Sequence, residues 1–456
     1  MYNDRILKAL AGTGAEIGDR IRIRRLADNV DFIGLLLPKT AWSDPDCIVI
    51  KLKSGYNAGV RFSEGTTVIE LVEKGKPITP GAVISKDSEG KSLPDAGTLP
   101  SVSILGMGGT IASGVEYRTG AVFPIFKPED LIRTVPALGK LARIDGEQVT
   151  NIFSEDVTPY HWKLMAERIA EKIGEGEDGV ICTHGTDTMH YTSAALSFML
   201  QNLPVPVIVV GAQRSSDRGS SDNVVNLVCA TLAALDEAAV VGVCMHAGTS
   251  DEACYLHPGT KVRKMHTSRR DTFRSINAKP FSYINYYSHT ITHLRDDYLR
   301  RDAGRKLRLD TDFNPRVGLI KFHPYMNPEF VAGLSKYYDG IVLEGTGLGH
   351  ASANVTDEHC RPIIRELQGL INSGVHVVMT SQTIYGRLNM NVYSTGRDLQ
   401  DAGVLCGEDM LPETAFVKLM WVLGHARDAA TVKKMMVGTT YAGEISERTD
   451  PETFLA

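Results

Sequence analysis

The feature that most constrains the fold is a pattern that repeats after Pro100. Short apolar runs end in glycine or threonine, and a longer segment with helical apolar spacing follows each of them. Continuous apolar runs of this length are typical of strands buried on both faces, and intervening helices are typical of parallel pairing. The pattern therefore predicts an α/β fold with mostly parallel sheets. The predicted strands are 101–106, 179–183, 205–211 and 240–245, and the predicted helices are 162–173, 189–201 and 224–235.

A charged stretch with few strand-forming residues, 294–314, separates this unit from a second one. The same alternation resumes after it, with predicted strands at 317–322, 340–343 and 375–379. A final helix is expected to begin at Pro412, because proline is favoured in the first turn of a helix. We therefore expect two α/β domains, at 100–300 and 301–456.

The residues ahead of these units have a different pattern. Isoleucine alternates with arginine at 20–24, and the apolar run at 47–53 ends in a turn of Ser, Gly, Tyr and Asn. Short alternating runs of this kind are typical of strands. Residues 1–75 are therefore predicted to form a small β-barrel. The following segment, 76–99, is rich in Pro, Gly, Ser, Asp and Lys, as expected of an exposed linker.

The charge of the chain excludes a cationic field over the whole molecule. The sequence holds 49 Lys and Arg and 54 Asp and Glu, for a formal net charge of −5. Any contact with RNA must therefore be local or be made by another protein. Arg20, Arg22 and Arg24 best fit a solvated sheet face, and contact with phosphate or packing against a partner are the alternatives.

Cysteine usage indicates a reducing compartment. The seven cysteines are scattered, odd in number and without a CxxC pair, which is typical of reduced thiols and unlike a zinc knuckle. The amino terminus lacks the sustained apolar core of a secretory signal, and no apolar run is long enough to span a membrane. We therefore expect a cytoplasmic protein.

Two strand ends carry hydroxyl groups that suit catalysis. Thr110 follows the glycines of the turn at 106–109, and a lone turn of this kind more often holds a threonine with a purely structural role. A second turn presents Thr186 and Asp187 at the end of another predicted strand. Since ligands bind at the carboxyl ends of strands in open α/β sheets, both turns are expected to meet at one crevice.

A threonine hydroxyl is a weak nucleophile and needs a base, for which a neutral lysine oriented by Asp187 is suitable. His184 and His190 are six positions apart and have no partner at metal-ligand spacing. They are therefore expected to have core or surface roles.

Three segments together resemble the signatures of the bacterial-type L-asparaginase family, in the same order and at comparable spacing. They are Gly108-Gly-Thr-Ile-Ala112, Thr183-His-Gly-Thr-Asp-Thr188 and Gly211-Ala-Gln-Arg214. The resemblance implies two asparaginase-like α/β domains, with the active site in the first. It also implies hydrolysis of the side-chain amide of Asn or Gln. Thr110 would attack the amide, and Thr186, Asp187 and Lys264 would form the proton relay.

The position of the lysine follows from the resemblance of 262–267 and 271–275 to the family segment that carries it, with Lys261 as the alternative. The family's substrate-contacting Ser-Gln pair corresponds to Ser154 and Glu155. The glutamate is a departure from the family, although it can still bind a substrate ammonium group. Tyr117 corresponds to a family flap tyrosine, at a shorter spacing from the first threonine than is usual.

Further phrases resemble, more narrowly, the asparaginase-like subunits of archaeal tRNA-dependent amidotransferases, which have an extension before the first α/β domain. These phrases are 116–122, 379–386, 391–396 and 407–414. The resemblance implies a glutaminase that releases ammonia for a partner subunit, which converts Glu-tRNA(Gln) to Gln-tRNA(Gln). It also implies a homodimer within a heterotetramer, with tRNA bound through the complex.

The resemblance implies no cofactor and no metal in this chain, with ATP and Mg²⁺ used by the partner subunit. In agreement, the sequence has no Gly-x4-Gly-Lys-Ser/Thr motif, and Gly345-Thr-Gly-Leu-Gly349 lacks the spacing of a dinucleotide-binding turn. Two alternatives stay open at this point. One is a free-standing L-asparaginase, and the other is a non-catalytic scaffold in a tRNA complex.

Overall fold

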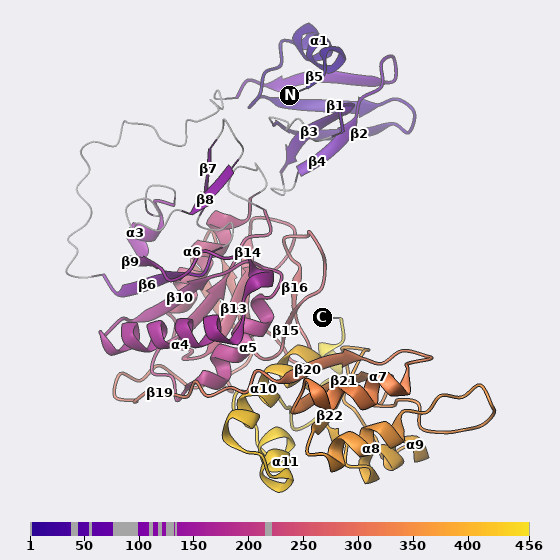
Figure 1. Cartoon of the computed structure of the whole chain (residues 1–456). Coiled ribbons are helices and arrows are strands. Elements are labelled where there is room, and N and C mark those ends of the chain that lie inside the picture. Colours follow the sequence, from indigo (N-terminus) through magenta and orange to yellow (C-terminus); the bar gives the residue numbers. More distant parts are fainter. Residues whose placement is uncertain are drawn as a thin grey trace.

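The chain forms an N-terminal unit (2–75), a central unit (99–293) and a C-terminal unit (316–455), which Figure 1 shows in this order from top to bottom. The computed structural model describes residues 2–37, 44–53, 57–75, 99–108, 113–116, 121–124, 132, 135–214 and 221–455. Most of the predicted linker, 76–98, lies outside the described residues.

The N-terminal unit is a helix packed on a five-stranded antiparallel sheet. The helix α1 (Asp4–Thr13) begins where the Asn3 side chain accepts a hydrogen bond from the Ile6 main-chain nitrogen, and it places Ile6 and Leu10 on the buried face of the sheet. The sheet order is β4-β3-β2-β1-β5. The strands are β1 (Arg20–Arg25), β2 (Val30–Leu36), β3 (Cys47–Leu52), β4 (Asn57–Arg61) and β5 (Thr67–Glu73).

The closed barrel that we predicted for these residues is not confirmed. Within the described part of the unit, β4 and β5 form the two edges and no pairing joins them, so the sheet is open. The alternating arginines lie on its half-exposed face. Arg22 pairs with Glu70 at 3.2 Å, and Arg24 pairs with Asp31 at 2.8 Å. These arginines are already neutralised by neighbouring strands, which favours the solvated face over a phosphate contact.

The central unit contains an eight-stranded sheet in the order β18-β17-β14-β13-β12-β10-β6-β9. Pairing from β13 through β12, β10 and β6 to β9 is parallel, whereas β13, β14, β17 and β18 pair antiparallel. The strands are β6 (Ser101–Gly106), β9 (Arg143–Gln148), β10 (Gly179–Thr183), β12 (Val207–Val210), β13 (Val241–His246), β14 (Ala253–Pro258), β17 (Ser282–Asn285) and β18 (Thr290–His293).

The sheet of the central unit is therefore mixed, and the prediction of a mostly parallel sheet holds only for the half from β13 to β9. The reason is the short connection at 247–252, which joins β13 to β14. A parallel neighbour needs a crossover of about a dozen residues or more, and a turn this short reverses the chain instead. The parallel half agrees with the predicted strands.

Helices cover both faces of the parallel half of the sheet. In β10, Val180 and Cys182 pack with α4 (Pro159–Gly174) and α5 (Met189–Met199), while Ile181 packs on the opposite side with α6 (Asn223–Ala234). This arrangement accounts for the continuous apolar run of the strand. All three helices agree in position with the predicted ones.

The C-terminal unit is a parallel sheet in the order β20-β21-β22-β23, with helices on both sides. The strands are β20 (Val317–Lys321), β21 (Gly340–Gly345), β22 (His376–Ser381) and β23 (Leu405–Cys406). The helices are α7 (Pro328–Gly333), α8 (Ile364–Asn372), α9 (Ser394–Asp401), α10 (Pro412–His425) and α11 (Ala429–Val437). The helix α10 begins at Pro412 as predicted.

The central and C-terminal units share one hydrophobic core. The α10 residue Trp421 stacks on Phe198 of α5 with ring centroids 5.9 Å apart, and one cluster of buried side chains extends through both helices. The remaining short elements are β7 (Ser113–Glu116), β8 (Ala121–Pro124), β11 (Leu200–Gln201), β15 (Val262–Lys264), β16 (Phe273–Ser275), β19 (Arg308–Leu309), α3 (Leu138–Leu141) and the 3₁₀ helices η1 (Ser154–Asp156), η2 (Leu334–Lys336) and η3 (Pro451–Thr453).

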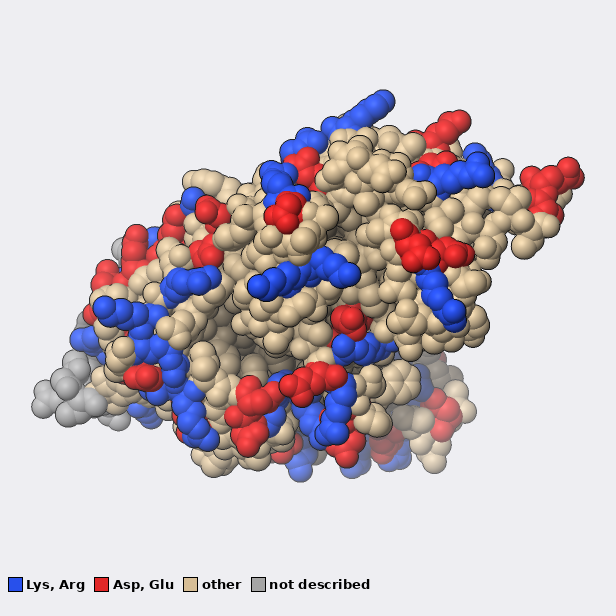
Figure 2. Space-filling view, turned by 90° about the horizontal axis from the view of Figure 1, so that it is seen from below, with Lys and Arg blue, Asp and Glu red and all other residues tan. Residues whose placement is uncertain are grey.

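The surface is mixed in charge. On the face shown in Figure 2, Lys and Arg side chains are interspersed with Asp and Glu, so this face offers no extended cationic area. Within the part of the chain that the structure describes, no helix has both the length and the hydrophobicity needed to cross a membrane.

Candidate active site

Two neighbouring parallel strands bring the predicted catalytic turns to one edge of the central sheet. Gly106 at the end of β6 pairs with Thr183 at the end of β10, and the main-chain nitrogen of Met107 donates to the Thr183 oxygen at 3.0 Å. Gly108 follows with φ +112°, and a Cβ atom there would lie 2.4 Å from the main-chain oxygen of Ile152. Only glycine fits this close approach. Thr110 and Tyr117 lie outside the described residues.

Lys264 contacts both predicted partners on the second turn. Its Nζ donates to the Thr186 Oγ1 at 2.9 Å and to the Asp187 Oδ1 at 2.7 Å. The side chain of Lys264 is only 11% exposed, whereas that of Asp187 is 68% exposed. The structure thus brings together three residues from segments nearly 80 positions apart. A lysine that touches a hydroxyl and is oriented by a carboxylate is arranged to exchange a proton with that hydroxyl.

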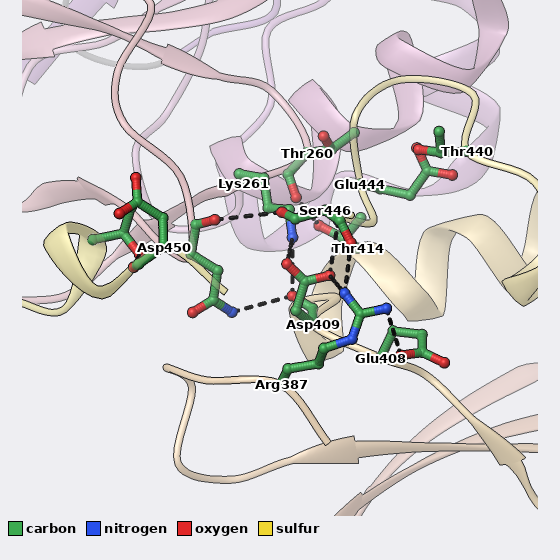
Figure 3. Close-up of polar contacts among 12 residues, drawn as sticks. Thr260, Lys261, Arg387, Glu408, Asp409, Thr414, Thr440, Glu444, Ser446 and Asp450 are labelled. Carbon is green, nitrogen blue, oxygen red and sulfur yellow. Dashed lines mark hydrogen bonds and ion pairs between the residues drawn. The ribbon is translucent and has the colours of Figure 1, made fainter. Parts of the chain in front are cut away.

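Lys261, the alternative, does not lie at this site. Its side chain is buried and donates to the Asp409 Oδ2 at 2.7 Å and to the Asp409 main-chain oxygen at 3.0 Å. Figure 3 shows this contact between the central and C-terminal units. Burial lowers the pKa of Lys261, and the charge of Asp409 opposes that effect. Its contacts are therefore structural, and Lys264 is the lysine beside Thr186.

The turn that carries Thr186 is supported by a buried histidine. His184 Nε2 lies 2.8 Å from Thr192 Oγ1, which accepts a hydrogen bond from Trp162 Nε1 at 3.0 Å. Because the Gly185 oxygen can only accept, His184 Nδ1 carries a proton and donates to it at 2.6 Å, and Nε2 of the neutral ring accepts from the Thr192 hydroxyl. Burial lowers the pKa of His184 to about 4, so this tautomer is uncharged at neutral pH.

His190 is also buried, and burial lowers its pKa to about 3. Both histidines therefore lie in the core, one of the two places expected for them. In the described part of the chain, no group of three or more His, Cys, Asp or Glu residues is arranged to hold a metal ion.

The third signature segment packs directly on Thr186. A Cβ atom at Gly211 would lie 2.9 Å from Thr186 Cγ2 and 2.7 Å from the His184 main-chain oxygen. The buried Asp222 holds this segment, because its carboxylate accepts from the main-chain nitrogens of Gln213 at 3.0 Å and Arg214 at 2.9 Å. Asp222 was not predicted from the sequence. From the sequence alone, its position just before a predicted helix suggests a helix cap. The structure instead shows its carboxylate bonded to another loop.

Ser154 is buried beside the second turn. A Cβ atom at Gly185 would lie 2.8 Å from Ser154 Cβ, and the Thr188 hydroxyl donates to the Ser154 main-chain oxygen at 2.5 Å. Glu155 follows in the 3₁₀ helix η1 and is exposed, with the Ser154 hydroxyl 3.4 Å from its carboxylate. Ser154 therefore lies against the turn that carries Thr186, and Glu155 is its neighbour in η1.

Family models match most of the chain. Residues 101–296 match the asparaginase N-terminal domain, residues 316–436 match the glutaminase/asparaginase C-terminal domain, and residues 15–72 match the GatD N-terminal domain. Among solved structures, the thermostable L-asparaginase from Thermococcus kodakarensis is similar with a TM-score of 0.67 and 30% identity, over 76% of this chain and 100% of that chain. L-asparaginase I from Vibrio cholerae is similar with a TM-score of 0.64 and 27% identity, over 76% of this chain and 99% of that chain.

Two curated relatives match over nearly the full length. The D subunit of the glutamyl-tRNA(Gln) amidotransferase from Pyrococcus furiosus is 48% identical over 99% of this chain and 100% of the relative. The D subunit from Methanothermobacter thermautotrophicus is 46% identical over 98% of each chain. The matches cover the N-terminal unit as well as the two asparaginase-like units. The chain therefore belongs to the family of glutamyl-tRNA(Gln) amidotransferase D subunits.

Proposed function

We propose that Thr110, Thr186, Asp187 and Lys264 carry out the amide hydrolysis for which the asparaginase-type domains of the chain are named. As a D subunit with an asparaginase-like fold, the chain is the amidohydrolase of a glutamyl-tRNA(Gln) amidotransferase and releases ammonia from glutamine. The observation that carries the assignment of residues is the bonding of Lys264 to both Thr186 and Asp187.

In the proposed reaction, the Thr110 hydroxyl attacks the side-chain carbonyl of glutamine. Its proton passes to Lys264, which Thr186 contacts and Asp187 orients. Main-chain N–H groups of the two turns stabilise the tetrahedral oxyanion. The C–N bond then breaks, the amine returns the proton to the leaving nitrogen, and ammonia departs. Water hydrolyses the resulting ester by the reverse proton path, which releases glutamate and restores the Thr110 hydroxyl.

The parallel pairing of β6 with β10 supports the place of Thr110 in this scheme, because it directs both turns to the same edge of the sheet. We assign substrate binding to Ser154 and Glu155, with the Glu155 carboxylate facing the α-ammonium group of glutamine. Tyr117 would cover the bound amino acid from the flap after the first turn.

The ammonia passes to the E subunit of the amidotransferase, which amidates glutamate attached to tRNA(Gln). In this proposal ATP and Mg²⁺ act in the E subunit, and the D subunit needs no cofactor. Two D subunits form a homodimer within a heterotetramer, and tRNA is bound through the complex. The chain works in the cytoplasm, in keeping with its reduced cysteines.

A free-standing L-asparaginase is the second candidate, and the likeness to solved L-asparaginases favours it. Those structures cover only 76% of this chain, however, whereas the D subunits also match its N-terminal unit. A non-catalytic scaffold would have no need for a lysine bonded to a threonine and an aspartate at a strand end.

The test of substrate and partner is ammonia release by the purified chain. We expect hydrolysis of glutamine that increases when the E subunit and Glu-tRNA(Gln) are present. Asparagine differs by one methylene, which is worth about 1–3 kcal/mol of discrimination. Full-rate hydrolysis of asparagine by the chain alone, with no effect of the E subunit, would support the free-standing asparaginase.

The test of the relay is Lys264→Ala. We expect a loss of about 10²- to 10⁴-fold in kcat, because a general base is removed. Folding should survive, since the released Asp187 carboxylate is largely exposed to water. Lys279→Ala, at a lysine that pairs with Glu452 on the surface, is the matched control and should keep full activity. Normal turnover in the folded Lys264→Ala variant would rule out the proposed relay.

A further inference from the structure

The strand that carries Lys264 is too short to hold its position alone. Among the residues that the structure describes, those of β15 (Val262, Arg263 and Lys264) pair only with β16, outside the eight-stranded sheet. An isolated two-stranded ribbon is marginally stable in water. The position of the lysine amine therefore depends on what packs against this ribbon.

The C-terminal unit anchors the chain just before β15. The Thr260 hydroxyl donates to the Ala442 oxygen at 2.9 Å, and the Thr414 hydroxyl donates to the Thr260 oxygen at 2.8 Å. Lys261 follows with its buried bonds to Asp409. Asp409 and Thr414, at the start of α10, lie beside Lys261 in Figure 3, and Ala442 belongs to the C-terminal segment after α11.

One further contact reaches the residue next to Lys264. The Nε atom of Arg263 forms an ion pair with the Glu413 Oε1 at 2.8 Å, and the Glu413 side chain is 6% exposed. Burial raises the pKa of Glu413, and the charge of Arg263 opposes that effect. Glu413 is the second residue of α10, a helix whose start is fixed by Pro412 and by the shared core. The carboxylate therefore has a well-defined position.

Glu413 also lies against the segment that follows Asp187. Its Oε1 is 4.0 Å from His190 Nε2, on the first turn of α5. Within the described residues, Glu413 Oε2 and His190 Nδ1 are buried without a hydrogen-bond partner. Buried polar atoms without partners are unfavourable, so this arrangement is not explained by stability alone.

We propose that Arg263 and Glu413 are positioning residues, through which α10 of the C-terminal unit sets the position of Lys264 against Thr186. The proposal rests on the proposed function of Lys264. Successive side chains of a strand point to opposite faces, so Arg263 faces α10 while Lys264 faces the catalytic turn. A shift of the main chain at Arg263 is therefore passed directly to the lysine amine.

The first test compares Arg263→Met, Glu413→Gln and the double variant by steady-state ammonia release. We expect kcat to fall about tenfold or more in each, with KM within about twofold, because small misplacements of a catalytic group cost rate more than binding. The double variant should resemble the single ones, since the two residues act as one unit. A folded variant that keeps wild-type kcat would overturn the proposal.

The matched control is Arg316→Met, which breaks an ion pair with Asp339 at 3.1 Å. Arg316 immediately precedes β20, and Asp339 immediately precedes β21. They therefore lie at one end of the C-terminal sheet, and α10 starts at the other end. Stability should decrease while kcat of the folded protein stays unchanged. An equal fall of kcat in this control would mean that loosening of the C-terminal unit, not the pair, is responsible.

A second measurement does not depend on turnover. The rate of acylation of Lys264 by an amine-reactive ester is measured by mass spectrometry, with the exposed Lys279 as internal reference. Lys264 is protected by its bonds and burial in the wild type, so Arg263→Met and Glu413→Gln should label it several-fold faster. Unchanged labelling would refute the positioning role. Faster labelling in a chain without hydrolytic activity would support it and refute the proposed function instead.

Discussion

Replacement of the fully buried Lys418 should be among the most destabilising changes in the C-terminal unit. Its Nζ lies 2.6 Å from Glu444 Oε1 and donates to the main-chain oxygens of Met436 at 2.7 Å and Thr439 at 2.8 Å. Both members of the ion pair are 0% exposed. Lys418→Met thus removes a buried positive charge, takes the donor from two main-chain oxygens and leaves Glu444 without its ion-pair partner.

The size of the loss follows from these contacts. Breaking one side of a buried ion pair costs about 3–5 kcal/mol. Glu444 keeps hydrogen bonds from the Thr440 hydroxyl at 3.1 Å and from the Ala442 main-chain nitrogen at 2.8 Å, which limits the cost. We expect a decrease of about 4 kcal/mol in the free energy of unfolding. The double variant Lys418→Met/Glu444→Gln keeps neither charge of the buried pair. It should therefore regain about half of the free energy of unfolding that Lys418→Met loses.

Urea unfolding monitored by tryptophan fluorescence measures this loss. Of the three tryptophans, Trp421 reports directly on the site, because its ring centroid lies 4.8 Å from that of Tyr441 in the segment bound by Lys418. Arg316→Met serves as the control for a surface ion pair and should cost about 1 kcal/mol or less. A Lys418→Met variant within about 1 kcal/mol of the wild type would refute the reasoning.

Two further predictions concern other sites. Gly211→Ala would place a methyl group 2.7 Å from the His184 oxygen and 2.9 Å from Thr186 Cγ2. We therefore expect the free energy of unfolding, measured in urea, to fall by about 1–3 kcal/mol. We also expect kcat, measured by ammonia release, to fall at least tenfold. An unchanged kcat would contradict the packing argument. The Arg427 hydrogen bond lowers the pKa of Asp339 from 3.8 to about 2, and this stabilisation, about 1 kcal/mol after solvent screening, is present above pH 4 and lost as the pH falls through 2. The stability difference between wild type and Asp339→Asn should therefore be present at pH 7 and narrow on acidification, and a constant difference from pH 7 to pH 2 would count against it.

The parallel strands could be predicted from sequence because burial on both faces leaves a continuous apolar run. The run at 179–183 coincides with β10, and the predicted helix at 224–235 differs from α6 by one residue at each end. The antiparallel strands β14, β17 and β18 were missed. Their sequences mix Tyr, His, Ser, Asn and Thr with few aliphatic residues, so neither a continuous run nor a clear alternation marks them.

The site could be predicted only in part. The contact of Lys264 with Thr186 joins residues 78 positions apart, and only the resemblance to a family indicated it. The contact of Arg263 with Glu413 joins the central unit to α10, and neither residue stands in a recognisable motif. Such a pair cannot be identified from a single sequence. Taken one at a time, Arg263 is an ordinary charged residue of a short strand, and Glu413 is an ordinary charged residue of a helix.

The core shared by α5 and α10 has a consequence for synthesis of the chain. Phe198 emerges from the ribosome more than 200 residues before its stacking partner Trp421. Until then one side of α5 has nothing to pack against, so the central unit cannot complete its folding as an independent domain. Chains that stop before α10 should therefore be targets for chaperones and proteases even though every residue of the relay has already been made.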